Sequence, residues 1–186
     1  MFFFSNDENI NLNIKAGSIE EAYFLIVKND LDNALLIFEN LDSSRAKWGV
    51  FLISILKGFL TNYPTYFQVR NFFEIDLDYF IKNNKIEYVQ MMLGASQNLV
   101  IINQEIYKYI ARVMFENNYY KTSKEYLDKS KEVFFNDPEL HFIYTKYYMK
   151  MNSLENALNH INECLKIVPD YYPALVLKSE IIKNLA

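Results

Sequence analysis

Apolar residues recur at helical spacing along nearly the whole chain. In the segment 31–41 they are Leu31, Ala34, Leu35, Phe38 and Leu41. Positions three and four apart share one face of a helix, so this spacing indicates amphipathic helices. The pattern predicts helices over 18–28, 31–41, 45–58, 64–72, 74–83, 86–96, 104–116, 120–133, 138–151, 154–167 and 170–184. Because short turns separate them, the sequence predicts an all-α fold of antiparallel helical hairpins.

Capping residues mark several of the predicted helix starts. Ser18 and Glu21 have the spacing of a capping box. Asp137-Pro138 combines an acceptor side chain with a first-turn proline. Pro64 is expected as the first residue of its helix.

A second, longer period runs through the C-terminal two-thirds of the chain. Asn84, Asn118 and Asn152 follow one another at intervals of 34 residues. The columns behind them agree: Ile86, Tyr120 and Leu154 are apolar, Leu93, Leu127 and Ile161 are large and apolar, and Ser96, Ser130 and Cys164 are small. A fixed period of this length is typical of stacked repeats, which mostly serve as binding surfaces.

The repeated asparagines and the small residues each have a physical reason. A hairpin turn needs a left-handed backbone conformation, and after glycine Asn tolerates it best. We therefore expect Asn29, Asn84, Asn118 and Asn152 to adopt it. Small residues let paired helices approach closely, and they are Ala22, Ala111 and Thr145 on first helices with Ala34, Ser123 and Ala157 on second helices.

The region 59–73 breaks the repeat. Asn29 and Asn84 are 55 residues apart, too many for one repeat and too few for two. Either a shortened helix over 64–72 runs almost directly into 74–83, or 64–83 is one kinked helix. We favour the shortened helix, because it preserves the up-and-down alternation. The prediction is thus a single domain over 1–186, with an irregular N-terminal segment (1–16) and an irregular repeat (59–73).

The composition is typical of a helical protein and excludes some classes of function. The four Gly and four Pro are few for 186 residues, and the net charge is −4, with the excess of acidic residues in 1–93. No half of the chain is basic enough to indicate nucleic acid as the main partner. The apolar stretch from Val50 to Leu60 is too short to span a membrane. One cysteine, Cys164, suits a reducing compartment, and Met1–Phe4 lacks the features of a signal peptide. We therefore expect a cytoplasmic protein.

The residues from Asn152 to Pro169 resemble the tetratricopeptide repeat (TPR). The matching residues are Leu154, Ala157, Ile161, Cys164 and Leu165, followed by Ile167-Val168-Pro169-Asp170, with Tyr144, Thr145 and Tyr148 in the preceding helix. Segments 18–41 and 74–133 match more loosely, without the closing proline, and 42–73 departs most. The resemblance implies a right-handed α-α superhelix, here a solenoid of about five hairpins plus a C-terminal capping helix. It also implies that first helices line a concave groove that binds peptides or partner proteins.

The family's arrangement allows the groove residues to be named. They are Tyr23, Ile26, Asp78, Ile81, Lys108, Arg112, Phe115, Phe142, Lys146, Met149 and Lys150. The groove would then be apolar at its N-terminal end and basic, with interleaved aromatics, at its C-terminal end. Such a surface suits an amphipathic helix or an extended peptide with an acidic stretch. Alternatively, these charges only solvate a helix face.

The function that these patterns favour is a non-catalytic adaptor for a protein or peptide partner. Three alternatives stay open: a small TPR chaperone, a helical-repeat binder of single-stranded RNA, and a subunit that forms homo-oligomers. Oligomers would form through the aromatic segment 63–80 or the unpaired last helix, unless Lys178, Lys183 and Asn184 give that helix a polar outer face. We expect no nucleic acid partner and no membrane span.

No residue pattern favours catalysis, a metal or a cofactor. His141 and His160 lie on different predicted helices, and neither has carboxylate or cysteine neighbours at metal-ligand spacing. Cys164 is expected to be a buried, inert thiol. The four glycines are isolated, so no phosphate-binding loop is present. We expect no enzymatic activity.

Overall fold

The computed structural model describes residues 17–58 and 64–185, and every regular element in these residues is helical. Contacts divide the chain into two compact units, Met1–Lys57 (unit 1) and Gly58–Ala186 (unit 2). The predicted irregular segment 1–16 and residues 59–63 lie outside the described residues. The all-α fold is confirmed. A single domain over the whole chain stays a prediction.

Unit 1 contains one hairpin and one further helix. Helices α1 (Ile19–Val27) and α2 (Leu31–Glu39) form the hairpin, and α3 (Ser44–Leu56) packs against α2. The Tyr23 ring meets the buried ring of Phe38 edge-on, with centroids 5.8 Å apart. Gly49 of α3 lies directly against the Phe38 ring. The absent side chain at Gly49 therefore makes the room that Phe38 occupies.

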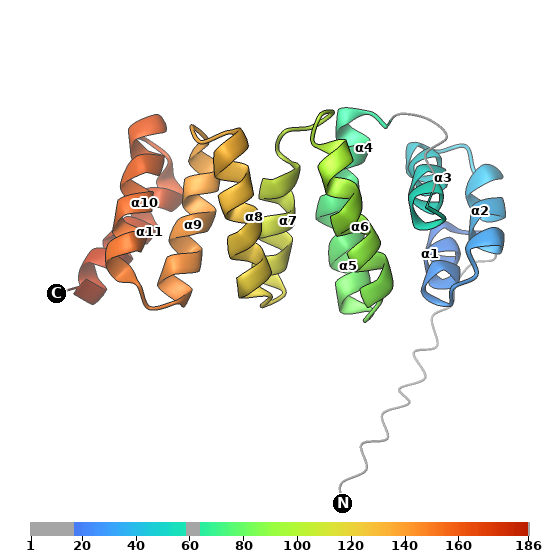
Figure 1. The fold of residues 1–186 in the computed structure, drawn as a ribbon, viewed down its shortest axis with the longest axis horizontal. Helices are drawn as coiled ribbons and strands as arrows, with labels where there is room; N and C mark the ends of the chain where they lie inside the picture. The colour runs from blue at the N-terminus through green and yellow to red at the C-terminus, as the bar shows by residue number, and fades with distance from the viewer. Residues whose placement is uncertain (1–16, 59–63, 186) are drawn as a thin grey trace, which may run out of the picture. The chain divides into compact units, whose positions relative to one another are not determined.

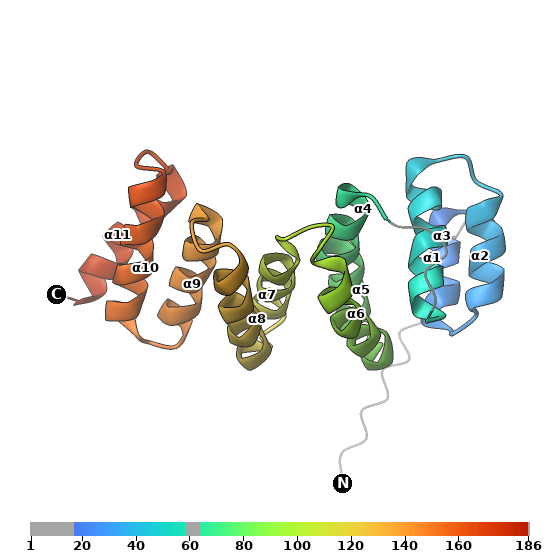
Figure 2. The same ribbon diagram turned by 45° about the horizontal axis from the view of Figure 1, so that its top comes forward.

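Unit 2 is a stack of helical hairpins. It runs through α4 (Tyr66–Asn71), the π-helical η1 (Phe72–Asp76), α5 (Leu77–Lys82), α6 (Ile86–Leu99), α7 (Ile106–Glu116), α8 (Tyr120–Val133), α9 (Pro138–Lys150), α10 (Leu154–Ile167) and α11 (Tyr172–Leu185). Each helix packs on its neighbour in sequence, and first helices also touch, since α7 contacts both η1 and α9. Figures 1 and 2 show these helices side by side in chain order, as in an α-α solenoid.

The predicted helix starts are mostly confirmed. The Ser18 hydroxyl accepts from the Glu21 backbone N–H at 3.1 Å, although the Glu21 carboxylate reaches back to the N–H of Gly17 rather than to that of Ser18. Asp137 accepts from the N–H groups of Glu139 and Leu140 at the start of α9. These contacts satisfy donors that have no partner within the helix.

The four hairpin asparagines adopt the conformation predicted for them. Asn29, Asn84, Asn118 and Asn152 have φ angles of 64°, 56°, 66° and 55°. The small residues beside these turns are also buried as expected. Ala111 and Thr145 of the first helices are fully buried, and so are Ser123 and Ala157 of the second helices.

The prediction of a shortened helix over 64–72 is wrong. Thr65 and Gln68 form a capping box, so the helix begins at Tyr66 and Pro64 lies before the cap. The backbone stays helical through α4, η1 and α5, because the π-helical turn of η1 joins the two α-helical parts without a break. Residues 66–82 thus form one continuous first helix, paired with α6. The described residues form four hairpins rather than about five, with α3 and α11 outside them.

None of the helices in the described residues is both long enough and apolar enough to cross a membrane.

Candidate functional site

The 34-residue period aligns side chains on the first helices of unit 2. Asp78 of α5, Arg112 of α7 and Lys146 of α9 share one register, and Glu74, Lys108 and Phe142 share another. Two more columns lie just before or at the start of the later first helices. They are Asn103, Asp137 and Tyr171, and Glu105, Glu139 and Pro173. Stacked first helices bring these columns together.

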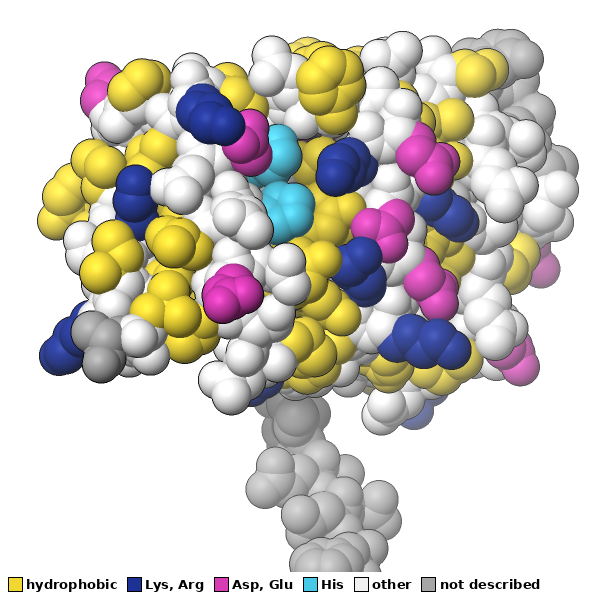
Figure 3. Space-filling view, turned by 60° about the vertical axis from the view of Figure 1, so that its left-hand side comes forward, with side chains coloured by type: hydrophobic (Ala, Val, Ile, Leu, Met, Phe, Trp, Pro, Cys, Tyr) yellow, Lys and Arg dark blue, Asp and Glu magenta, His cyan; other side chains and the backbone are white. Residues whose placement is uncertain are grey.

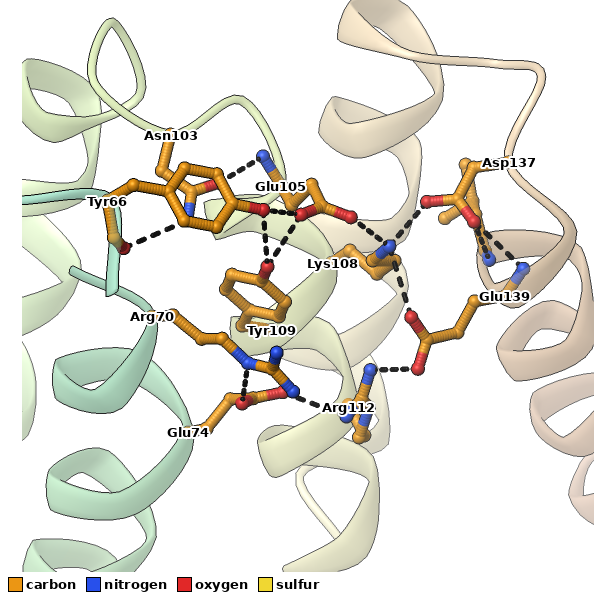
Figure 4. Close-up of polar contacts among 11 residues, drawn as sticks. Tyr66, Arg70, Glu74, Asn103, Glu105, Lys108, Tyr109, Arg112, Asp137 and Glu139 are labelled. Carbon is orange, nitrogen blue, oxygen red and sulfur yellow. Dashed lines mark hydrogen bonds and ion pairs between the residues drawn. The ribbon is translucent and has the colours of Figure 1, made fainter. Parts of the chain in front are cut away.

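Lys108 lies at the centre of an ionic network between α7 and α9. Its Nζ is 2.6 Å from Glu105, 2.5 Å from Asp137 and 3.1 Å from Glu139. The side chain is only 4% exposed, and Figure 4 shows it pointing between the three carboxylates. Burial alone would lower the pKa of Lys108, but hydrogen bonds to Asp137 and Glu105 outweigh it and raise the pKa. Lys108 is therefore a charged, buried link between two hairpins.

Arg112 extends the network to both neighbouring first helices. It donates to Glu74 of η1 at 2.9 Å and pairs with Glu139 of α9. Glu74 also accepts from Arg70 at 2.6 Å. These contacts tie three successive first helices together, as Figure 4 shows.

Tyrosine hydroxyls complete the network at Glu105. The hydroxyls of Tyr66 and Tyr109 both donate to this carboxylate, and they lie 3.2 Å from each other. Although burial raises the pKa of Glu105, the hydrogen bonds from Lys108, Tyr66 and Tyr109 lower it to about 2. Burial and these same contacts raise the pKa of Tyr109. Glu105 is thus ionised and Tyr109 neutral at neutral pH.

Between α9 and α11 the ionic contacts give way to aromatic ones. Phe142 corresponds to Lys108 in the 34-residue register, and Tyr171 corresponds to Asp137. The ring centres of Phe142 and Tyr171 are 5.5 Å apart. Pro173 replaces Glu139 in the same way. Lys146 therefore lacks the carboxylate that Arg112 has, and no ion pair is found for it among the described residues.

The lysines of α9 instead lie over aromatic rings. Lys146 is 5.7 Å from the ring centres of both Phe115 and Phe142, and Lys150 is 5.7 Å from that of Tyr120. The rings of Phe115 and Tyr120 are 5.6 Å apart, which makes the surface continuous. We call Phe115, Tyr120, Phe142, Lys146, Met149, Lys150 and Tyr171 the aromatic–lysine patch. Its side chains are half-buried or exposed, so both the cations and the rings are accessible.

The structure brings only some of the predicted groove residues into this patch. Phe115, Phe142, Lys146, Met149 and Lys150 belong to it. Three others, Tyr23, Ile26 and Ile81, are buried in the core.

The charged groove residues outside the patch already have partners within the chain. Asp78 pairs with Lys82 at 2.6 Å and accepts from Asn117 at 2.8 Å. Lys108 and Arg112, which were predicted to form part of the basic end of the groove, are paired with carboxylates of the same chain.

The aromatic segment 63–80 is divided between core and surface. Phe72, Phe73 and Phe80 are fully buried, whereas Tyr66 and Phe67 are exposed. Tyr63 lies outside the described residues. Three of the seven aromatic residues in this segment therefore belong to the core.

The two histidines meet across the α9/α10 hairpin, which the sequence analysis did not foresee. Their Nδ1 atoms are 3.0 Å apart, and His141 Nε2 is 3.2 Å from the Phe135 carbonyl. The ring centres are 5.3 Å apart, so the two nitrogens point at each other as in an N–H···N hydrogen bond. Figure 3 shows both histidines (cyan) side by side at the surface, where an open cleft of about 610 Å³ is lined in part by Lys131, His160 and Glu163.

Two further observations concern reactive groups. In the described part of the chain no group of three or more His, Cys, Asp or Glu side chains is placed to hold a metal ion. Cys164 is buried, and burial raises the pKa of its thiol to about 11. The thiol is therefore protonated at neutral pH, as expected for an inert packing residue.

Comparison with known proteins gives a likeness in structure but no sequence family. No family model matches the sequence, and no curated protein matches it significantly. A similar solved structure is that of a thermophilic TPR protein of Thermus thermophilus. It has a TM-score of 0.49 and 13% sequence identity, over 88% of this chain and 96% of that one.

Proposed function

We propose that this chain is a non-catalytic, TPR-like interaction module whose aromatic–lysine patch binds an acidic segment of a partner protein. The hairpins stacked in register and the residues from Asn152 to Pro169 support the TPR-like part of the proposal. A stack of this kind presents an extended surface and holds few of the enclosed clefts that catalysis uses.

One observation supports the choice of surface most directly. Asp137 and Glu139, which pair with Lys108 and Arg112, correspond to Tyr171 and Pro173 in the next repeat, so α11 offers α9 no such carboxylates. Lys146 therefore keeps its charge available, and Lys150 is exposed, so both cations lie next to rings that can pack on apolar side chains. A carboxylate of a partner would pair with such a lysine, and an aromatic or aliphatic neighbour would cover Phe115 or Phe142.

The test is an array of peptides that differ in acidic, basic and aromatic content, probed with the purified chain. We expect retained peptides to combine Asp or Glu with an aromatic or aliphatic residue. Lys146→Glu/Lys150→Glu should weaken their binding at least about tenfold, since both attractive charges become repulsive. Lys28→Glu/Lys47→Glu, on exposed lysines of unit 1, makes the same change in net charge and should bind like the wild type.

Retention of the same peptides by the Lys146→Glu/Lys150→Glu variant would refute the proposed surface. Preference for basic peptides, or tight salt-dependent binding of RNA, would refute the proposed partner class. Lys108 and Arg112 are left unchanged in these variants because their loss would disturb the stack itself.

A further inference from the structure

Helix α11 is apolar on two faces. One face, with Ala174 and Ile181 fully buried, packs against α10. The other carries Tyr172, Leu175, Val176 and Ile182, which are 74%, 42%, 50% and 50% exposed. These four residues, together with the small Ser179 between them, are called the α11 stripe. Lys183 and Asn184 are exposed at the end of the helix, but this second face is mainly apolar, and Figure 3 shows hydrophobic side chains gathered at this end of unit 2.

The 34-residue register shows what this face does in the other hairpins. Leu175 corresponds to Tyr107 and His141, Ser179 to Ala111 and Thr145, and Ile182 to Met114 and Tyr148. In α7 and α9 these positions contact the second helix of the hairpin. Tyr107 meets Tyr126 of α8 at 5.8 Å, the Ala111 carbonyl accepts from Ser123 of α8, and Tyr148 stacks on His160 of α10.

Leu175, Ser179 and Ile182 of the α11 stripe thus lie on the face that accepts an antiparallel helix elsewhere in the chain. The stripe has a small residue at the centre, where Ala111 and Thr145 allow close approach, and large apolar residues on both sides. Among the described residues no helix covers it. An occupant of this face should be an apolar helix face of similar length.

We propose that the stripe is a dimer interface on which α11 of a second copy packs antiparallel, with Ser179 near the two-fold axis. A second copy supplies an exposed apolar helix face of matching length, because the stripe itself is one. Antiparallel pairing brings the Leu175 end of each helix against the Ile182 end of the other, with the two Ser179 residues close to the crossing point. An isologous contact of this kind closes on itself and stops at two copies.

Charge favours this orientation over the parallel one. In a parallel pair the two Lys183 side chains would face each other, and the helix dipoles would be aligned. The antiparallel pair separates the lysines and opposes the dipoles. A contact of one helix face per copy is at the small end of specific interfaces, on the order of 1,000 Å² in total, so we expect a dissociation constant in the micromolar range.

The first test is sedimentation of the full chain over about 1 to 500 µM, a range that spans the expected dissociation constant. The wild type should shift from monomer to dimer, whereas Leu175→Glu/Ile182→Glu should stay monomeric throughout. Gln90→Glu/Gln97→Glu, on the exposed face of α6, adds the same charge and should dimerise like the wild type. A wild type that is monomeric over the whole range would overturn the proposal, and so would a dimer that survives the stripe variant.

A cross-linking test needs no added charge. Mixing Leu175→Cys and Ile182→Cys chains under oxidation should give a disulfide between the two variants, while either alone should give little. Lys166→Cys, exposed on α10, serves as the control for random collision. A predominance of bonds between identical variants would rule out the antiparallel pairing. This surface does not depend on the aromatic–lysine patch, so dimerisation can fail while peptide binding holds.

Discussion

At the scale of single residues, Lys108 is a buried cation that pairs with three carboxylates, so its loss should strongly affect stability. Replacing it by Met removes the cation from a buried site and leaves Asp137 without its ion pair. We expect a loss of about 3–5 kcal/mol in the free energy of unfolding, because an uncompensated buried charge is costly. Urea unfolding followed by circular dichroism measures it.

A matched comparison separates burial from charge. Lys82→Met removes a cation from the pair with Asp78, in which the lysine is 65% exposed. That change should cost less than about 1 kcal/mol, as exposed pairs generally do. Equal losses in the two variants would mean that the network around Lys108 adds no more than a surface ion pair.

The histidine pair predicts how stability depends on pH. Burial, followed by the positive charges of His141, Lys131 and Lys124, lowers the pKa of His160 from 6.5 to about 4, while Glu163 acts in the opposite sense. Burial also lowers the pKa of His141. The unfolded chain therefore takes up protons near pH 6.5 that the folded chain refuses until about pH 4. Stability should be full above pH 6.5 and fall as the pH drops through this window.

Urea midpoints at steps between pH 7.5 and pH 4.5 test this dependence. His160→Gln keeps a polar side chain but cannot titrate, so its profile should be flatter. The folded state lowers the pKa of Glu105 from 4.5 to about 2. The stability that comes from Glu105 should therefore be lost at lower pH, between pH 4.5 and about pH 2. A wild-type midpoint that stays constant from pH 7 to pH 5 would contradict the role assigned to the histidines.

At the scale of elements, each hairpin turn depends on the left-handed backbone conformation of its asparagine. Asn152 has φ of 55° between α9 and α10. Asn152→Ala should lower the free energy of unfolding by about 1 kcal/mol, because a Cβ-bearing residue without a turn-forming amide is strained there. Asn152→Gly should be neutral or slightly stabilising. Thermal unfolding of both variants measures the difference, and an alanine variant as stable as the glycine variant would count against the explanation.

The sequence predicted most helices because their causes are local. Helical periodicity, caps and left-handed asparagines depend on residues a few positions apart, as in the turn at Asn118 and the start at Asp137. The stretch from Tyr66 to Lys82 was misread for a different reason. A π-helical turn shifts the helical register at Phe72–Asp76, so the continuous helix does not match a constant period of 3.6 residues.

The candidate site was harder to predict than the helices. The sequence predicted that Lys108 and Lys146 both line the groove, but whether each lysine is paired or accessible depends on residues from the next repeat. Asp137 and Glu139 form ion pairs with the cations of α7, whereas Tyr171 and Pro173 in the next repeat carry no charge to pair with Lys146. Comparing these columns across repeats could have shown the difference. The contact between His141 and His160 could not be predicted, since both side-chain orientations depend on packing.

At the scale of the whole molecule, unit 1 can be followed through the single tryptophan, Trp48, which lies beside Gly49 in α3. A Cβ at residue 49 would come within 2.4 Å of the Phe38 ring, so the ring would have to move. Gly49→Ala should therefore lower the unfolding midpoint seen by Trp48 fluorescence, at a cost of about 1–3 kcal/mol for overpacking. Gly94→Ala, in α6 with open space around it, is the control and should not destabilise the chain.

The network that joins α4, η1, α7 and α9 also means that the repeats are not interchangeable parts. Each first helix is matched to its own neighbours: Arg112 finds Glu74 on one side and Glu139 on the other. Deleting the 34-residue repeat that contains Lys108 and Arg112 would keep the spacing of the helices but put Phe142 and Lys146 in the positions of these two residues. Glu74 would then face a shorter cation, and the buried lysine would disappear. The polar side chains thus determine the order in which the repeats can follow one another, whereas the apolar side chains determine only that the repeats stack.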